Sequence, residues 1–506
     1  MKEISEAYFL DLLRKRSNEA MPLHVPGHKR NTQMLPPDLP WQLDVTEVPP
    51  FDNLHSPQGI LQDCQNFAAE YWGSRSSFFL VGGSTAGILA GIRSCTRRGD
   101  GVVLARACHQ SVYHALELCG LKPIYVDPPF IDGFYGSLSA QMVEEAILDG
   151  CRVEQPKGEI NARKTQEHSQ GKPSLVIITS PTYEGIISDV AGIAAVCHRY
   201  DIPLFVDAAH GAHLDLPGME VLDREGPGLG FPTGAVKNGA DLVVHGLHKT
   251  LPALTQTALL HVCSQRVSET AIQHQLSVFQ SSSPSYPLMA SIDFCNRFLA
   301  EEGIELAKDH LRNLIWFRKK MERLKNIRLF RGESNTQIYG HDPARILLKP
   351  TGLDGWTLSK RLAAEKRIKL ELATECYALG ITTLLDTAET FRRLYRVLEE
   401  LDTESELLKK TARQGRAEKI PPALIQKIPC ESAMQQRGVT LALSRSTGRI
   451  SREYLWQYPP GIPIVTPGQE ITAELIDWIQ GTKAQLHSSY GGVPQKISVL
   501  PQDVAL

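Results

Sequence analysis

Short apolar runs alternate with helix-like patterns along residues 61–325 of the chain. The runs have the length and residue types of buried strands, and the segments between them repeat apolar residues at helical spacing. Such alternation predicts an α/β fold, with a mostly parallel sheet covered by helices on both faces. The predicted strands are 78–81, 102–105, 122–126, 174–180, 203–207, 241–245 and 257–263.

The pattern changes after residue 325. Strand-like runs at 345–348, 367–372 and 380–385, with helical patterns near 356–366 and 387–401, predict a small α+β domain. A charged connector follows, then an aromatic and Pro-rich segment at 454–463 that we expect to form an irregular loop, and a final helix near 471–486.

The first 60 residues hold a short amphipathic helix and are otherwise dense in Pro, Gly and His. A segment of this kind cannot bury a core of its own, so we expect an arm that wraps over another part of the protein. The hydrophilic stretch 154–172 is interpreted as a surface insertion. The predicted domains are an N-terminal arm (1–60), a large domain (61–325), a small α+β domain (326–401) and a connector with a C-terminal domain (402–506).

Composition narrows the class of protein. The 54 basic and 56 acidic residues nearly cancel, so charge favours neither nucleic acid nor an anionic membrane as a partner. No apolar run is long enough to span a bilayer, and the start of the chain lacks a signal-like apolar region. The ten cysteines are scattered without a C-x-x-C pair, which argues against a zinc site or a disulfide framework. We therefore expect a cytoplasmic enzyme without a metal centre.

Candidate chemistry gathers where two predicted strands end. Asp207 closes the run 203–207, and Lys249 follows the run 241–245 directly after His248. In open α/β sheets, ligands bind outside the carboxyl ends of the strands. A lysine that can attach a carbonyl cofactor, with an aspartate to pair with a pyridinium nitrogen, indicates pyridoxal 5'-phosphate (PLP) chemistry. Taken alone, such a lysine is usually a solvated loop residue and such an aspartate a helix cap.

Two further segments fit the same site. The strand 78–81 runs into a Gly-rich turn that opens a helix, where backbone N–H groups and the hydroxyls of Ser84 and Thr85 can bind a phosphate. An ordinary N-capped helix start explains this turn equally well. His109, after the next strand, is placed to lie on a cofactor ring, although by itself it is more simply a structural histidine.

Together these motifs resemble the Orn/Lys/Arg decarboxylases, PLP enzymes of fold type I that share the aspartate aminotransferase architecture. The resemblance covers nearly the whole chain. It rests on His24-Val25-Pro26-Gly27-His28-Lys29, Gly83-Ser84-Thr85, Ala107-Cys108-His109, Pro181-Thr182-Tyr183, Asp207-Ala208-Ala209-His210-Gly211-Ala212-His213, His248-Lys249-Thr250-Leu251, Tyr458-Pro459-Pro460-Gly461-Ile462-Pro463 and Pro467-Gly468-Gln469-Glu470.

The resemblance implies a role for each matching residue. Lys249 would carry PLP, Asp207 would pair with the ring nitrogen, and His109 would stack on the ring. It further implies a homodimer or higher oligomer, whose active sites are completed across the interface with help from the N-terminal arm. The remaining cofactor-binding positions are Ser84 and Thr85 for the phosphate, His210 beneath the ring and His248 beside the phosphate and the lysine.

The chain departs from the family pattern at four positions. Gly246 stands where the family usually has a phosphate-binding Ser, and Leu247 stands where a small or polar residue is common. Ile88 replaces an expected Asn, and Ala208 replaces the commoner Glu after Asp207. None of these departures removes Lys249, Asp207 or His109; the resemblance implies that together they alter the phosphate-binding part of the site.

The activity implied is α-decarboxylation of a basic amino acid to CO2 and a polyamine precursor, with arginine slightly favoured over lysine or ornithine. Two alternatives stay open: a PLP aminotransferase or lyase, and a catalytically degenerate paralogue that acts as a binding or regulatory protein. A cationic substrate side chain needs a carboxylate or aromatic partner, and the candidate carboxylates are Glu470, Asp44 and Glu47.

Overall fold

The computed structural model describes most of the chain. The described residues are 9–17, 21–31, 33–36, 38–152, 171–219, 230–332, 336–408, 420–458, 461–482, 485–491, 493 and 495–502. The described chain separates into two compact units, which are treated individually below. Unit 1 comprises residues 1–94, 203–312 and 383–386, and unit 2 comprises residues 95–202, 313–382 and 387–506.

The main sheet has seven strands in the order β1-β10-β9-β8-β6-β2-β3. Strand β10 is antiparallel to both of its neighbours, whereas the β8–β9, β2–β6 and β2–β3 pairs are parallel. The α/β prediction with a mostly parallel sheet is therefore confirmed, and each predicted strand is present within two residues at either end. The strands are β1 (Ser76–Leu80), β2 (Gly101–Ala105), β3 (Lys122–Val126), β6 (Leu175–Thr179), β8 (Leu204–Asp207), β9 (Leu242–His245) and β10 (Ala258–Val262).

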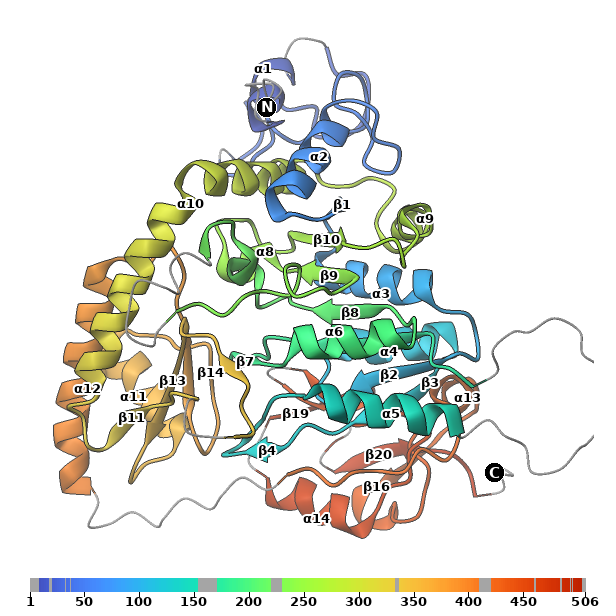
Figure 1. Cartoon of the computed structure of the whole chain (residues 1–506), viewed down its shortest axis with the longest axis vertical. Coiled ribbons are helices and arrows are strands. Elements are labelled where there is room, and N and C mark those ends of the chain that lie inside the picture. The colour runs from blue at the N-terminus through green and yellow to red at the C-terminus, as the bar shows by residue number, and fades with distance from the viewer. Residues whose placement is uncertain are drawn as a thin grey trace, which may run out of the picture. The chain divides into compact units, whose positions relative to one another are not determined.

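Helices connect these strands, as the alternating pattern predicts. In unit 2, α5 and α6 lie side by side against the sheet (Figure 1). Helix α4 begins after His109, whose side chain caps it by accepting from the Ser111 N–H, and it ends at Gly120 in the left-handed conformation that favours glycine. The connecting helices are α2 (Ile60–Trp72), α3 (Gly83–Cys95), α4 (Gln110–Cys119), α5 (Ala140–Arg152), α6 (Val190–Arg199), α8 (Leu247–Thr250), α9 (Glu269–Phe279) and α10 (Tyr286–Met321), with the 3-10 turn η1 (Ala212–Asp215).

The outer edge of β1 is closed by glutamine side chains. The amide of Gln280 accepts from the Val81 N–H at 2.9 Å and donates to the Phe79 carbonyl at 3.2 Å. The carbonyl oxygen of Gln65 accepts from the Phe79 N–H at 3.2 Å. These side chains occupy main-chain groups that an edge strand would otherwise leave open.

The small α+β region of unit 2 has the predicted elements with shifted bounds. Its antiparallel sheet has the order β11-β13-β15-β14, and α11 (Gly355–Lys366) packs against it. The predicted strand 367–372 is wrong over most of its length, because Arg367 ends α11 in a left-handed conformation and β14 covers only Leu372–Ala373. The other elements are β11 (Ile327–Leu329), β13 (Arg345–Pro350), β15 (Ala378–Ile381) and α12 (Ala388–Leu408).

The C-terminal part of unit 2 corrects another expectation. The segment 454–463, predicted to be an irregular loop, contributes β17 (Leu455–Gln457) and the start of β18 (Ile462–Val465). Pro463 is tolerated because β18 lies at the edge of the β18-β17-β19 sheet, where its missing N–H costs no second pairing. Residues 459–460 lie outside the described residues. The other elements here are α13 (Cys430–Gln435), β16 (Val439–Ala442), α14 (Ala473–Gly481), β19 (Leu486–Ser488) and β20 (Lys496–Val499).

The N-terminal helix α1 (Phe9–Arg16) is short and amphipathic, as predicted, and buries Phe9 and Leu13. The ring of Phe9 packs 6.0 Å from that of Tyr286 on α10, and its backbone N–H donates to buried Asp293. This part of the arm therefore covers another part of unit 1. Of the predicted insertion 154–172, residues 154–170 lie outside the described residues.

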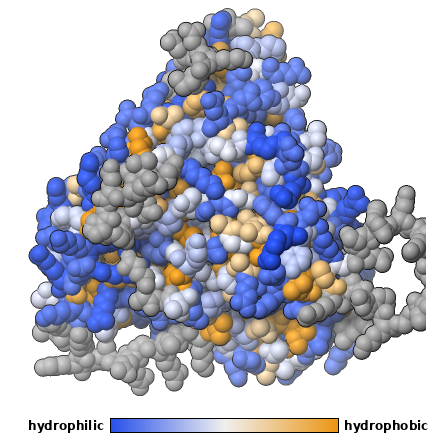
Figure 2. Space-filling view, viewed as in Figure 1, coloured by the Kyte–Doolittle hydropathy of each residue, from blue (hydrophilic) through white to orange (hydrophobic). Residues whose placement is uncertain are grey.

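The face drawn in Figure 2 is mostly hydrophilic, with hydrophobic residues in small separate patches. Among the described helices, none combines the length and apolar character that crossing a membrane requires.

Candidate active site

The ends of β8 and β9 bring Asp207 and Lys249 into one neighbourhood of unit 1. The two strands are parallel, with Asp207 in register with Val244. Strand β8 ends at Asp207, and β9 ends at His245, two residues before α8 carries Lys249 into its first turn. The prediction that these strands deliver an aspartate and a lysine to the same edge is consistent with this register.

Asp207 is a buried carboxyl group, only 3% exposed. Burial raises its pKa, and the positive charge of Lys249 and the N–H of Ala209, which donates to Asp207 Oδ1 at 3.1 Å, oppose that rise. The net shift is upward, so the two opposing interactions do not fully compensate for desolvation. A cationic ring nitrogen placed against this carboxylate would supply further compensation.

Gly246 permits three segments to converge around Lys249. A Cβ atom built on Gly246 would lie 2.8 Å from the Ala209 carbonyl oxygen, 3.1 Å from Cδ of Lys249 and 3.2 Å from Oγ of Ser84. The Gly246 N–H also donates to the Ala209 carbonyl at 3.2 Å. The departure from Ser at this position therefore coincides with close packing of the loops after β1, β8 and β9.

Ser84 lies in the first turn of α3, directly after the Gly-rich turn. Its Oγ is shielded from solvent and has no hydrogen-bond partner within the part of the chain that the structure describes. A shielded hydroxyl without a partner, at a helix N-terminus and beside the lysine-bearing segment, fits the phosphate of PLP. Thr85, the next residue, is exposed.

His248 is a neutral base beside Lys249. Its Nδ1 lies 3.1 Å from the carbonyl oxygen of Thr257, which assigns the ring proton to Nδ1 and leaves Nε2 as an acceptor. Burial lowers the pKa of His248, the Thr257 carbonyl opposes this, and the charge of Lys249 lowers it further. His248 is therefore uncharged near neutral pH.

The remaining predicted residues differ in their placement. His210 is partly buried in the loop after Asp207, in unit 1. His109 belongs to unit 2, where its Nδ1 lies 2.8 Å from the hydroxyl of Ser111. Gly461, from the Pro-Pro-Gly motif, packs beside it: the Gly461 carbonyl accepts from the Gln110 N–H, and a Cβ built on Gly461 would lie 3.5 Å from the imidazole. Unit 2 thus brings two motifs that are far apart in sequence together.

The carboxylates considered for the substrate side chain already have partners on the protein. Glu470 pairs with Lys427 at 3.1 Å, Asp44 pairs with His28 at 3.1 Å, and Glu47 accepts from the hydroxyl of Thr46. These contacts single out none of the three.

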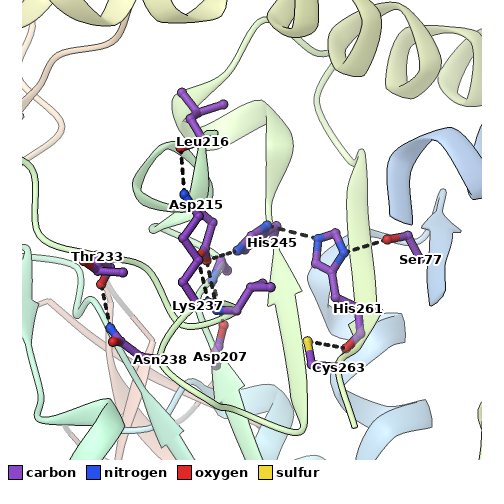
Figure 3. Close-up of polar contacts among 12 residues, drawn as sticks. Ser77, Asp207, Asp215, Leu216, Thr233, Lys237, Asn238, His245, His261 and Cys263 are labelled. Atoms are coloured by element: carbon purple, nitrogen blue, oxygen red, sulfur yellow. Dashed lines mark hydrogen bonds and ion pairs between the residues drawn. The ribbon is translucent and has the colours of Figure 1, made fainter. Parts of the chain in front are cut away.

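Sequence reasoning missed a buried polar chain behind the site. Asp215, His245 and His261 are all fully buried and hydrogen-bonded in a row (Figure 3). The available signal was the presence of histidines inside the apolar runs 241–245 and 257–263, at positions interpreted as core.

Comparison with known proteins agrees with this architecture. The Orn/Lys/Arg decarboxylase major domain matches residues 9–370, and the C-terminal domain of the same family matches residues 408–497. The chain is 29% identical to an arginine decarboxylase of Bacillus subtilis (strain 168), over 95% of this chain and 94% of that protein. It is 32% identical to the uncharacterized protein YaaO of the same organism, over 90% of this chain and 89% of that protein.

A solved structure shows the same fold. The lysine decarboxylase LdcF of Francisella novicida superposes with a TM-score of 0.78 at 18% sequence identity, over 98% of this chain and 81% of that one. Both family domains are thus matched in order along the chain. The chain belongs to the Orn/Lys/Arg decarboxylase family of PLP-dependent amino-acid decarboxylases.

Proposed function

We propose that this protein is a PLP-dependent α-decarboxylase of a basic amino acid, with arginine preferred over lysine and ornithine. The observation that carries the proposal is the convergence around Gly246 of Lys249, the segment after Asp207 and the shielded Ser84 hydroxyl, which has no partner among the described residues. The preference for arginine is supported by the arginine decarboxylase relative that aligns with almost the full chain.

Seven residues would hold the cofactor in this proposal. Lys249 would carry it through the ε-amino group, Asp207 would face the ring nitrogen, and His109 would stack on the ring. When bound, PLP supplies a conjugated ring that accepts the electron pair left on Cα as CO2 departs. The other contacts are from Ser84 and Thr85 to the phosphate, from His210 beneath the ring, and from His248 beside the phosphate.

The protein contributes charge placement and proton handling. Asp207, held in a site without solvent access, keeps a negative charge where a protonated ring nitrogen needs one. The neutral His248, whose pKa the charge of Lys249 lowers, keeps Nε2 as an acceptor, and in this proposal it holds a proton that the lysine gives up. Its Nδ1–H bond to the Thr257 carbonyl fixes the ring in this tautomer.

The decisive experiment measures CO2 release from the PLP-supplemented protein with L-arginine, L-lysine and L-ornithine offered separately. Lys249→Ala should abolish release and the absorbance band at about 420 nm that lysine-bound PLP gives. Lys308→Ala is the matched control, because Lys308 is a surface lysine of α10 that pairs with Glu305.

The outcomes separate the alternatives. Release from arginine above the other substrates supports the proposal, and a preference for lysine or ornithine keeps the reaction but overturns the substrate. A band without CO2, accompanied by formation of an oxo acid, indicates an aminotransferase. The absence of both band and release indicates a degenerate paralogue.

We further propose that the protein acts as a homodimer whose interface includes the N-terminal arm. Large apolar side chains are concentrated and exposed along this arm, at Met21 (79%), Leu23 (85%), Val25 (64%), Met34 (83%) and Leu39 (53%). Exposed apolar groups at this density favour burial against another surface. Light scattering should give twice the chain mass, and Leu23→Ser with Met34→Ser should weaken the dimer; a wild-type monomer would overturn this proposal.

We propose a cytoplasmic location and a role in supplying polyamine precursors. All ten cysteines are free thiols, which suits a reducing compartment. Cell fractionation with an antibody to the full chain tests the location.

A further inference from the structure

A row of buried polar side chains crosses unit 1 and includes His245, which immediately precedes the lysine-bearing segment (Figure 3). Oδ2 of Asp215 lies 3.1 Å from Nε2 of His245, and Nδ1 of His245 lies 3.1 Å from Nε2 of His261. Nδ1 of His261 then lies 2.8 Å from the hydroxyl of Ser77. The row crosses from η1 through β9 and β10 to β1, and we call it the Asp215 relay.

The hydrogen atoms of the Asp215 relay have a consistent direction. The carboxylate can only accept, so Nε2 of His245 donates to it. An arrangement that satisfies every atom has Nδ1 of His245 accepting from Nε2–H of His261, whose Nδ1 in turn accepts from the Ser77 hydroxyl. Burial, reinforced by the neighbouring His245, keeps the pKa of His261 well below its usual value, so His261 has a single ring proton to place.

Backbone groups hold the carboxylate end of the Asp215 relay in place. Asp215 also accepts from the N–H groups of Val236 and Lys237, at 3.3 and 3.4 Å. A Cβ on Gly234 would lie 2.3 Å from its carboxyl carbon, so glycine is required for this chain segment to wrap the carboxylate. The Trp72 indole packs at 5.2 Å from His245 and 5.9 Å from His261, which closes the side of both imidazoles.

The two ends of the bond between Asp215 and His245 lie on the two segments that carry the proposed chemistry. Asp215 ends η1, in the loop that follows Asp207. His245 ends β9, and Gly246 and α8 with Lys249 come next. A backbone bond from Gly246 to Ala209 joins the same two segments. The relay therefore braces the lysine-bearing turn against the aspartate-bearing loop.

We infer that Asp215, His245 and His261 are positioning residues that hold Lys249 in place relative to Asp207. The inference rests on the proposed function, because it assigns a role toward the cofactor that Lys249 would carry. Buried polar groups that are fully hydrogen-bonded specify one arrangement of the segments that carry them, and loss of one member leaves the others unsatisfied.

The test compares His245→Leu, which removes both ring nitrogens, with His245→Gln, whose amide can donate to Asp215 and accept from His261. Ser77→Ala, at the far end of the row, is a milder variant that keeps the carboxylate bond. His274→Leu is the matched control, because His274 is exposed on α9. Full-length proteins are used throughout.

The first readout is hydrogen exchange of the apoprotein. His245→Leu should speed exchange at least about tenfold in peptides covering 208–216 and 246–251, with little change in α10, as expected for a local opening. The second readout is the pH midpoint at which the absorbance of lysine-bound PLP changes. Asp207 and His248 act electrostatically on Lys249, so a displaced lysine should move this midpoint by about 0.5 pH unit or more.

The expected order of effect in both readouts is His245→Leu, then Ser77→Ala, with His245→Gln close to wild type and His274→Leu unchanged. If the melting temperature falls but neither the local hydrogen exchange nor the pH midpoint changes, the inference is overturned. The Asp215 relay then contributes only to the packing of the core. If His245→Leu does not fold, Ser77→Ala decides: a midpoint shift supports the inference, and a wild-type midpoint overturns it.

Failure of the proposed function is distinguished from failure of this inference by the behaviour of the wild-type protein. A wild-type protein with the PLP band but without CO2 release refutes the decarboxylase, while the midpoint still tests the relay. A wild-type protein without any band refutes the cofactor, and the exchange pattern of the apoprotein then decides alone.

Discussion

Two buried aspartates stand at opposite ends of the neighbouring strands β8 and β9. Asp241, immediately before β9, accepts from the Leu204 N–H at 2.8 Å, from the Ser264 hydroxyl, and from Arg266 at 3.5 Å. Asp207, at the end of β8, accepts from the Ala209 N–H at 3.1 Å and otherwise relies on the charge of Lys249.

Under the proposed function, the difference separates a carboxylate that serves the fold from one that would face a ligand. At the amino end, the protein itself satisfies Asp241 from three sides, so removing it should cost stability. At the carboxyl end, desolvation outweighs the compensation that Asp207 receives, as expected where charge is held for chemistry rather than for folding. The five predictions below test this contrast.

Asp207→Asn should produce the largest effect. Loss of the charge opposite the ring nitrogen should lower kcat/KM for CO2 release by about 10²–10³-fold, typical of a preorganised electrostatic contact. The melting temperature of the apoprotein should not fall, since the amide oxygen can still accept from Ala209. If activity is retained within tenfold, Asp207 has no catalytic role.

Asp241→Asn should lower stability and leave activity nearly unchanged. The amide cannot accept from all three donors, and we expect a loss of about 1–3 kcal/mol in the free energy of unfolding. Denaturant unfolding measures the loss, and kcat/KM per folded molecule should stay within about twofold, a bound that corresponds to roughly 0.4 kcal/mol. A large drop in kcat/KM would show that the amino end of the strands also affects the chemistry.

Gly246→Ser tests whether restoring the family's hydroxyl helps this chain. The added Cβ would meet the Ala209 carbonyl at 2.8 Å, so we expect a loss of about 1–2 kcal/mol in stability from overpacking. PLP affinity, measured by fluorescence titration, should fall. Tighter PLP binding would mean that the surrounding loops move to accommodate the serine, and that the added hydroxyl strengthens PLP binding more than the crowding weakens it.

The stability difference between Asp207→Asn and wild-type apoprotein should depend on pH. The folded pKa of Asp207 is raised, so its favourable contribution is complete below the unfolded pKa and is lost as pH rises through the folded pKa. The variant should match wild type at about pH 3, below the unfolded pKa, and become more stable than wild type as pH rises towards neutral. Denaturant unfolding across this range provides the check, and a constant difference would contradict the raised pKa.

Thr85→Ala should have the smallest effect. Thr85 is exposed, so loss of its hydroxyl should weaken PLP binding by only about threefold, within the range for one solvated hydrogen bond. Ser84→Ala, which removes the shielded hydroxyl, should weaken it more. Equal effects of the two would remove the distinction drawn from burial.

The sequence predicts the structure well where buried strands appear as continuous apolar runs. Each strand of the main sheet lies inside or within two residues of a predicted apolar run, and the ends of those runs located Asp207 and Lys249. The prediction was wrong where pairing between strands outweighs the local preference of the residues. Pro463 lies in an edge strand opposite Trp456, in a segment expected to be irregular. The contact between Gly461 and His109 was equally unreadable, because it joins residues far apart in the chain.

The Asp215 relay shows a second kind of failure. The apolar pattern of β9 and β10 predicts only that His245 and His261 are buried. It assigns a residue to a face of the sheet and does not identify the hydrogen-bond partners of its side chain. Only the placement of η1, β9 and β10 shows that His245 and His261 satisfy each other and Asp215.

The glutamine side chains along β1 bear on how this protein behaves at high concentration. An open strand edge is a template on which another chain can grow by backbone pairing, the first step towards fibrils. With Gln65 and Gln280 bound to Phe79 and Val81, a growing fibril would first have to strip away bonds that the native protein already makes. The β1 edge should therefore resist amyloid-like growth.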